Sequence, residues 1–139
     1  MAEDKKTASA VPPYLVAALI CDVAVRDPSS GKQNLIGIFD TLRAAKFPTA
    51  QPMGLYLKVT DASGYYPIRV DFVRSDSDKL LAQAHGNLNA PDRMKSFDMS
   101  VNFTPLPIPA AGRYEFRLYA SEMYLGSAFL DAFPVNDKM

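Results

Sequence analysis

Alternation of apolar and polar residues is the feature of this chain that most limits what it can fold into. In KSFDMSVNF (95–103), every second residue from Phe97 onward is apolar, and polar residues stand between them. The same period of two recurs in YPIRVDF (66–72) and in GRYEFRLYA (112–120). Successive side chains of a strand point to opposite faces, so this period predicts strands with one buried and one solvent-facing side.

Residues typical of turns separate these alternating runs at regular intervals. Examples are DPSSGK (27–32), TDASGY (60–65) and RSDSD (74–78). Runs of roughly 8 to 12 residues between turn signals are the spacing of an all-β sandwich or barrel. We therefore predict an all-β fold of about eight strands, an antiparallel two-sheet β-sandwich of immunoglobulin-like style. The predicted strands cover about 14–26, 33–46, 53–61, 65–74, 79–88, 95–104, 112–121 and 124–134.

The segment AGRYEFRLY (111–119) gives a more specific indication of this fold. Gly112, Tyr114 and Phe116 have the spacing of the tyrosine corner of immunoglobulin-like sandwiches, with Phe116 in the place of a cysteine. Gly112 and Tyr114 are therefore predicted to be structural residues. The chain has no tryptophan to complete the usual core of that fold.

Three prolines in PLPIP (105–109) remove every second backbone donor from that segment. Proline within a sheet removes a ladder hydrogen bond, so this segment cannot be a central strand. We predict an extended crossing between the two sheets, in which Leu106 and Ile108 are available to pack.

The stretch NLIGIFDTLRAAKFP (34–48) has two interpretations. A helix capped by Asp40 would contain only residues 41–47 before Pro48, and isolated helices that short are marginal. A long bent strand would need Gly37 as a structural residue, either at a bulge or where a neighbouring backbone or ring approaches closely. We favour the bent strand, and a short helix beginning at Asp40 is the alternative.

The first residues, MAEDKKTASAVPP (1–13), are polar or small and end in two prolines. This composition predicts a flexible tail over 1–13, followed by a single sandwich domain over 14–135 and a short tail over 136–139. A chain of 139 residues is long enough for one domain with a real core and too short for two.

The length of one apolar run, the number of cysteines and the balance of charges indicate the compartment and the class of partner. The apolar run LVAALICDVAV (15–25) is shorter than the ~20 residues of a membrane span, and we favour a buried strand there over a signal peptide. The single cysteine, Cys21, rules out an intrachain disulfide and suits a reducing cytoplasm. The 15 basic and 15 acidic residues cancel, so we expect neither nucleic acid nor a membrane as partner.

The residue pattern offers little to a catalytic site. The only histidine, His85, shares the polar face of its predicted strand with Gln83 and Asn87, and Cys21 occupies a core position. A Cys–His pair needs both groups within ~3 Å and a third group that orients the base. Zinc, nucleotide and phosphate motifs are missing from the sequence. We predict no catalytic residue, no cofactor and no enzymatic activity; an enzyme with a dispersed carboxylate site is the least favoured alternative.

Three aspartates at predicted hairpin tips carry the second functional hypothesis. Asp61, Asp76 and Asp78 stand in turn segments, and TDASGYYP (60–67) has a faint likeness to the calcium loops of C2 domains. Calcium requires several carboxylates that converge from adjacent loops. Aspartate is also a preferred turn residue because it bonds to its own backbone. A C2-like module that binds calcium or lipid is therefore the alternative, and we predict no metal site as the leading interpretation.

Tyrosines near the turns carry the leading functional hypothesis. Exposed tyrosines contribute large contact area at low entropy cost and are enriched at protein interfaces. The same residues could instead cover sheet edges or cap the core. We predict a non-enzymatic protein-interaction or structural module that contacts a protein partner, or further copies of itself, through a sheet edge or the tyrosine-bearing loops. The candidate contact residues are Tyr56, Tyr65, Tyr66, Tyr119 and Tyr124.

Two stretches, 14–48 and 109–135, together carry a pattern written A-x-x-C-D … GK … L-I-G-I-F-D … F-P, followed by a closing hairpin. The residues of this pattern are Ala18, Cys21, Asp22, Gly31, Lys32, Leu35, Ile36, Gly37, Ile38, Phe39, Asp40, Phe47 and Pro48. The chain thereby resembles a bacterial domain family of uncharacterised function and about this length, and the likeness covers the whole predicted domain. The resemblance implies a β-sandwich in a bacterial interior. It implies no activity, so no functional residue is carried over.

Overall fold

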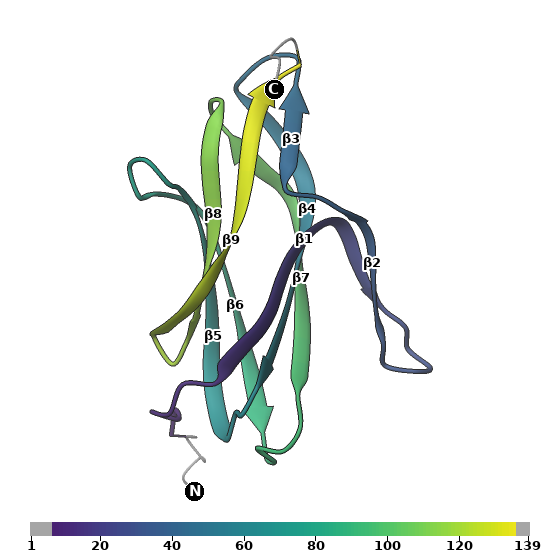
Figure 1. Cartoon of the computed structure of the whole chain (residues 1–139), viewed down its shortest axis with the longest axis vertical. Helices are drawn as coiled ribbons and strands as arrows, with labels where there is room; N and C mark the ends of the chain where they lie inside the picture. Colours follow the sequence, from purple (N-terminus) through teal and green to yellow (C-terminus); the bar gives the residue numbers. More distant parts are fainter. Residues whose placement is uncertain (1–6, 136–139) are drawn as a thin grey trace, which may run out of the picture.

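The computed structural model of the chain describes residues 7–135, and these residues fold into nine strands without a helix (Figure 1). The strands are β1 (Tyr14–Arg26), β2 (Gln33–Ile38), β3 (Thr41–Ala44), β4 (Thr49–Thr60), β5 (Gly64–Arg74), β6 (Lys79–Ala90), β7 (Phe97–Ile108), β8 (Gly112–Ala120) and β9 (Met123–Pro134). The predicted all-β sandwich is confirmed. There is one strand more than predicted because the segment 33–46 is divided into β2 and β3.

The strands form two stacked sheets. The four-stranded sheet has the order β2-β1-β4-β7, and the five-stranded sheet has the order β3-β9-β8-β5-β6. Neighbouring strands run antiparallel, as predicted, except for β3 and β9, which pair in parallel. The pair β4-β7 takes the place of strands B-E of the immunoglobulin fold, and the three strands β9-β8-β5 take the place of G-F-C.

Aromatic rings from both sheets meet at the centre of the core. The ring of Phe72 on β5 lies 4.7 Å from that of Phe116 and 5.5 Å from that of Tyr114, centroid to centroid. Phe103, from β7 in the other sheet, lies 5.6 Å from Phe116. Phe72, Tyr114 and Phe116 are fully buried, and burial of one such ring stabilises the fold by about 2–3 kcal/mol.

The tyrosine corner is present as predicted. The Tyr114 hydroxyl donates to the backbone carbonyl of Ala110 at 2.6 Å, and the Ala110 N–H lies 3.2 Å from the same hydroxyl oxygen. Gly112, at the start of β8, has φ +143°, a conformation that side chains rarely adopt. The corner therefore fixes the chain where it enters the five-stranded sheet.

The proline-rich segment behaves differently from the prediction. Residues 105–108 belong to β7 and continue its pairing with β4 as far as Thr49 opposite Ile108, so they are not the crossing between the sheets. β7 is an edge strand, where a missing backbone donor costs no ladder hydrogen bond. Leu106 and Ile108 are fully buried, and the crossing comes at residues 109–111.

The stretch 34–48 is neither a helix nor one continuous strand. β2 ends at Ile38 in the four-stranded sheet, and β3 begins at Thr41 in the five-stranded sheet. Between them, the Phe39 N–H donates to the Ile20 carbonyl at 2.9 Å, and the Asp40 carbonyl accepts from the Asp131 N–H at 2.9 Å. Residues 39–40 therefore carry the chain from one sheet to the other.

Gly37 stands just before this crossing and is required by its surroundings. Its φ is +71°, and a Cβ at this position would lie 2.2 Å from the Asp22 Oδ2 atom. A neighbour does approach Gly37 closely, but it is the Asp22 carboxylate side chain, whereas a bulge or the approach of a backbone or ring was predicted.

Part of the predicted N-terminal tail contacts the sandwich. The Ser9 N–H donates to the Tyr65 carbonyl at 2.7 Å, and the Tyr66 hydroxyl donates to the Val11 carbonyl at 2.8 Å. The remaining parts of the two predicted tails, 1–6 and 136–139, lie outside the described residues. Within the described part of the chain, no helix is long and apolar enough to cross a membrane.

Replacing Tyr114 by phenylalanine tests the tyrosine corner. We expect Tyr114→Phe to lower the free energy of unfolding by about 1–2 kcal/mol, because the Ala110 carbonyl loses its donor inside the fold. The measurement is urea unfolding. Tyr119→Phe is the matched control and should change the stability by less than about 0.5 kcal/mol. Equal effects of the two changes would contradict the assignment.

Replacing Gly37 by alanine tests the origin of its requirement. We expect Gly37→Ala to cost roughly 1–2 kcal/mol of unfolding free energy, because a side chain disfavours positive φ. The cost should persist in an Asp22→Ala background, measured by the same unfolding experiment. If removing the Asp22 carboxylate restored full stability, the close contact rather than the backbone conformation would explain the glycine.

Candidate functional site

The crossing at residues 39–40 leaves two strand edges only partly covered. β2 pairs with β1 from Cys21 to Arg26, and β3 pairs with β9 from Asp131 to Pro134. Among the described residues, the remaining lengths of β1 (14–20) and β9 (123–130) have a strand neighbour on one side alone. The two exposed edges face each other along one side of the sandwich.

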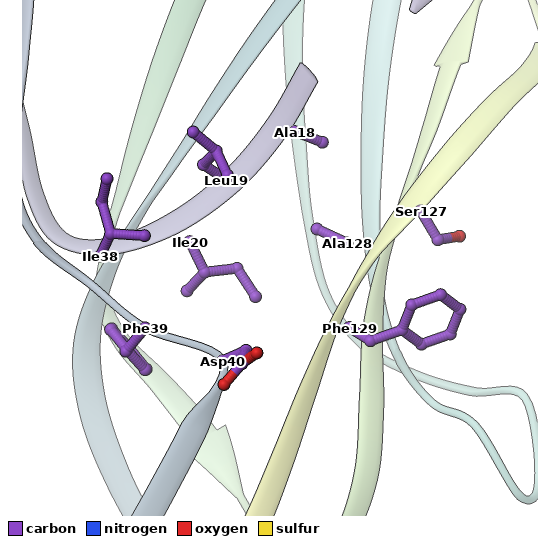
Figure 2. A pocket seen from close by; sticks show the side chains of 9 residues that line it. All are labelled: Ala18, Leu19, Ile20, Ile38, Phe39, Asp40, Ser127, Ala128 and Phe129. Atoms are coloured by element: carbon purple, nitrogen blue, oxygen red, sulfur yellow. The ribbon is translucent and has the colours of Figure 1, made fainter. Parts of the chain in front are cut away.

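A groove of about 470 Å³ opens between these edges, below the crossing. Figure 2 shows Ile20 and Ala128 pointing toward one another across it, with the Asp40 carboxylate at its end. Ser127 and Phe129 extend to the other side of β9. The residues that line this β1–β9 groove are Ala18, Leu19, Ile20, Ile38, Phe39, Asp40, Ser127, Ala128 and Phe129.

Backbone hydrogen-bonding groups point into the β1–β9 groove. The Asp131 N–H donates to Asp40 and the Val135 N–H donates to Ala44, so alternate residues of β9 direct their backbone groups to this edge. Continuing the alternation places the N–H and C=O groups of Phe129 and Ser127 on the same edge, where β3 no longer reaches. The groove thus presents an open strand edge.

The surface around the groove is apolar. Leu19, Ile38 and Phe129 are 37%, 58% and 44% exposed. The surface continues along β2 to Ile36, which is 57% exposed, on the hairpin of β1 and β2 whose end projects from the side of the sandwich in Figure 1. Contiguous exposed apolar side chains of this kind mark contact surfaces.

Two acidic residues at the crossing form no ion pair with the described residues, unlike most acidic residues of the fold. Asp22 and Asp40 are exposed, and among residues 7–135 neither has a basic group within 4 Å. The Asp40 carboxylate accepts a hydrogen bond from the Thr41 hydroxyl at 3.1 Å. Within the part of the chain that the structure describes, the groove therefore ends at a carboxylate that no ion pair neutralises.

The outer face of the five-stranded sheet has the opposite character. Glu115, 9% exposed, accepts hydrogen bonds from Arg117 at 3.1 Å, Ser127 at 2.9 Å and Ser75 at 3.1 Å. These donors, Arg117 foremost, lower the pKa of Glu115 against the opposing effect of burial. Arg117 also bonds Asp78 at 2.5 Å. The charges of this face are engaged with one another.

The five predicted contact tyrosines are spread over the molecule. Tyr66 is fully buried, so it belongs to the core and not to a contact surface. The Tyr56 hydroxyl donates to Asp98 at 3.0 Å, and the Tyr65 hydroxyl donates to Asn87 at 2.7 Å. These three residues are engaged inside the fold or along its own strands.

Tyr119 and Tyr124 are the two predicted tyrosines that the structure brings together. Their ring centroids are 5.7 Å apart, and the Arg69 guanidinium lies 4.1 Å from the centroid of the Tyr119 ring. Tyr124 is 57% exposed, and its hydroxyl lies 2.7 Å from that of Ser127. This pair lies on either side of the turn between β8 and β9.

The three tip aspartates do not converge. Asp61 precedes β5, whereas Asp76 and Asp78 follow it, and a strand of 11 residues spans more than about 30 Å. Asp61 is bound by Arg93 at 2.8 Å, and Asp76 by Arg74 at 3.2 Å. No group of three or more His, Cys, Asp or Glu side chains within residues 7–135 is arranged to hold a metal ion.

The two residues considered for catalysis lie on different sheets. His85, on β6, is exposed, with its Nε2 atom 3.2 Å from the Gln83 Oε1 atom. Cys21, on β1, is fully buried, and burial raises the pKa of its thiol, with a further rise from the Asp22 carboxylate. A raised pKa keeps the thiol protonated and poorly nucleophilic.

Sequence reasoning did not identify the groove. Its lining comes from residues 18–20, 38–40 and 127–129, three segments that the sequence pattern assigned to separate strands with no indication that they meet. The available signal was the polar Asp40 that follows the apolar run LIGIF, because a charge there interrupts a strand that would otherwise continue. Which strands would face each other at that point depends on pairing across the whole chain.

Comparison with known proteins adds one family. A family model matches residues 16–132, and its family is described as one of unknown function (DUF6941). No curated protein matches the chain. The predicted resemblance to an uncharacterised domain family is confirmed, and the matched span contains both edges of the groove.

The pKa of Glu115 predicts an acid-sensitive contribution to stability. The pKa of Glu115 is lower in the folded than in the unfolded state. Its contribution to the stability of the fold is therefore complete at a pH above the unfolded-state pKa, and it is lost as the pH falls through the folded-state pKa. Glu115→Gln should lower the free energy of unfolding at pH 7, and the difference from the unmodified protein should shrink toward pH 3. Unfolding measured across this range checks it; a difference independent of pH would contradict the network.

Proposed function

The chain belongs to the family of unknown function DUF6941, and we propose that it is a non-enzymatic protein-interaction module. It binds an extended segment of a partner protein along the open edge of β9, in the β1–β9 groove. The observation that carries this proposal is the backbone of Ser127 and Phe129, which points to an edge that β3 covers only from Asp131 onward.

Strand addition explains both the polar and the apolar features of the groove. An added segment would take the position on β9 that β3 occupies farther along, and backbone hydrogen bonds would supply sequence-independent affinity. Every second side chain of that segment would face inward. Ile20 and Ala128 line the place that such a side chain would enter.

The remaining surface supports an interaction role over catalysis. The acidic side chains of the five-stranded face are bound by arginines, as in the pairs Glu115–Arg117 and Asp131–Arg113. Cys21 is buried on the sheet opposite to His85. We place the module in a reducing compartment, the cytoplasm, because its one cysteine is a buried free thiol.

A proline substitution at the β9 edge tests the proposal. The probe is a short synthetic peptide of alternating threonine and valine, and its affinity is measured by calorimetry. Phe129→Pro removes an edge N–H without breaking the ladder to β8, so the affinity should fall about tenfold, the worth of one hydrogen bond. Phe129→Ala, the matched control, keeps the N–H and should retain more of the binding.

Two further results bear on strand addition. Methylation of alternate backbone nitrogens of the peptide should abolish binding when the blocked groups are those that face β9, and not when they face away. The proposal would be overturned if Phe129→Pro bound the peptide with full affinity and the peptide methylated on the side that faces β9 also bound with full affinity.

A further inference from the structure

The charges at the crossing specify the chemistry of the segment that the groove receives. Most acidic side chains of the described fold are matched by an arginine, among them Asp61, Asp76 and Asp98. Asp22 and Asp40 are the exceptions that lie beside Gly37 and the groove, and both are exposed.

Two basic side chains beside β9 are engaged with that strand. Arg113 holds the Asp131 carboxylate through two hydrogen bonds of 2.8 and 3.1 Å and lies over the ring of Phe129. Arg43 lies over the ring of Phe133 and donates to a backbone carbonyl of β9. Among residues 7–135 Asp40 forms no ion pair, so a basic side chain of a partner would meet this carboxylate without breaking an existing ion pair.

The position of Asp40 determines where along the added segment a basic residue would lie. The Asp40 carbonyl already pairs with the Asp131 N–H, so an added segment must end where β3 begins. The Asp40 carboxylate lies at this end of the groove, and Ile20 and Ala128 lie farther along it. A long basic side chain at the end of the segment reaches Asp40 while an apolar side chain of the same segment enters the groove.

Building on the proposed function, we infer that the partner segment is an extended peptide in which a lysine or arginine at one end accompanies inward-facing apolar residues. The basic residue pairs with Asp40, and the apolar residues pack between Ile20 and Ala128. Such an exposed ion pair contributes modestly to affinity and strongly to the choice of partner.

Charge exchange tests this inference. Three threonine–valine peptides carry lysine, glutamine or glutamate at one end, and a second set carries the same residues at the other end. In low salt the lysine peptide of one set should bind about threefold to fivefold more tightly than its glutamine counterpart. Asp40→Asn should remove this preference and Asp40→Lys should transfer it to the glutamate peptide. Asp61→Asn, a matched change at a distant turn, should leave it intact.

The outcomes separate the inference from the function on which it rests. If Asp40→Lys leaves the order of the three peptides unchanged while Phe129→Pro still weakens all of them, the charge inference fails and strand addition stands. If no peptide binds the unmodified protein, both fail. If light scattering shows that the chain self-associates, and Phe129→Pro abolishes this association, a second copy of the chain is the occupant and the inference of a separate partner peptide is overturned.

Discussion

The crossing of the chain between the two sheets at Phe39 and Asp40 is the constraint on which the rest of this structure depends. One short segment supplies an edge strand to each sheet, so it can cover neither edge along its full length. Gly37 makes the crossing possible by adopting φ +71° against the Asp22 carboxylate. The uncovered lengths of β1 and β9 follow directly, and with them the groove and its acidic end.

Two surfaces of the sandwich differ in how completely their polar groups are satisfied. On the five-stranded face, Glu115, Arg117 and their neighbours form a continuous network, and a partner would have to displace existing bonds to use it. At the groove, the backbone of Phe129 and the Asp40 carboxylate are directed outward next to apolar side chains. A partner there gains hydrogen bonds and buries apolar area without that loss, which favours the groove as the binding surface.

Local patterns predicted the fold well and the site poorly, for a physical reason. Alternation predicted β8 (Gly112–Ala120) to within one residue, and the spacing of Gly112 and Tyr114 predicted the tyrosine corner, because both signals reside in neighbouring residues of the sequence. The crossing at Asp40 and the pairing of residues 105–108 with β4 depend on partners distant in the chain. Likewise, the turns at the two ends of β5 have similar sequences. The sequence alone therefore did not show that Asp61 lies at the opposite end of that strand from Asp76 and Asp78.

Amide hydrogen exchange of the free protein, resolved residue by residue, tests the open edge of β9 most directly. The backbone groups of Ala128 and Leu130 point toward β8 and those of Asp131 toward Asp40, so these three amides should exchange slowly. The amides of Ser127 and Phe129 should exchange at least about tenfold faster than these neighbours, because they point into the groove. Protection of Ser127 and Phe129 equal to that of Asp131 would show that the edge is already occupied within the fold, and would contradict strand addition as the mode of binding.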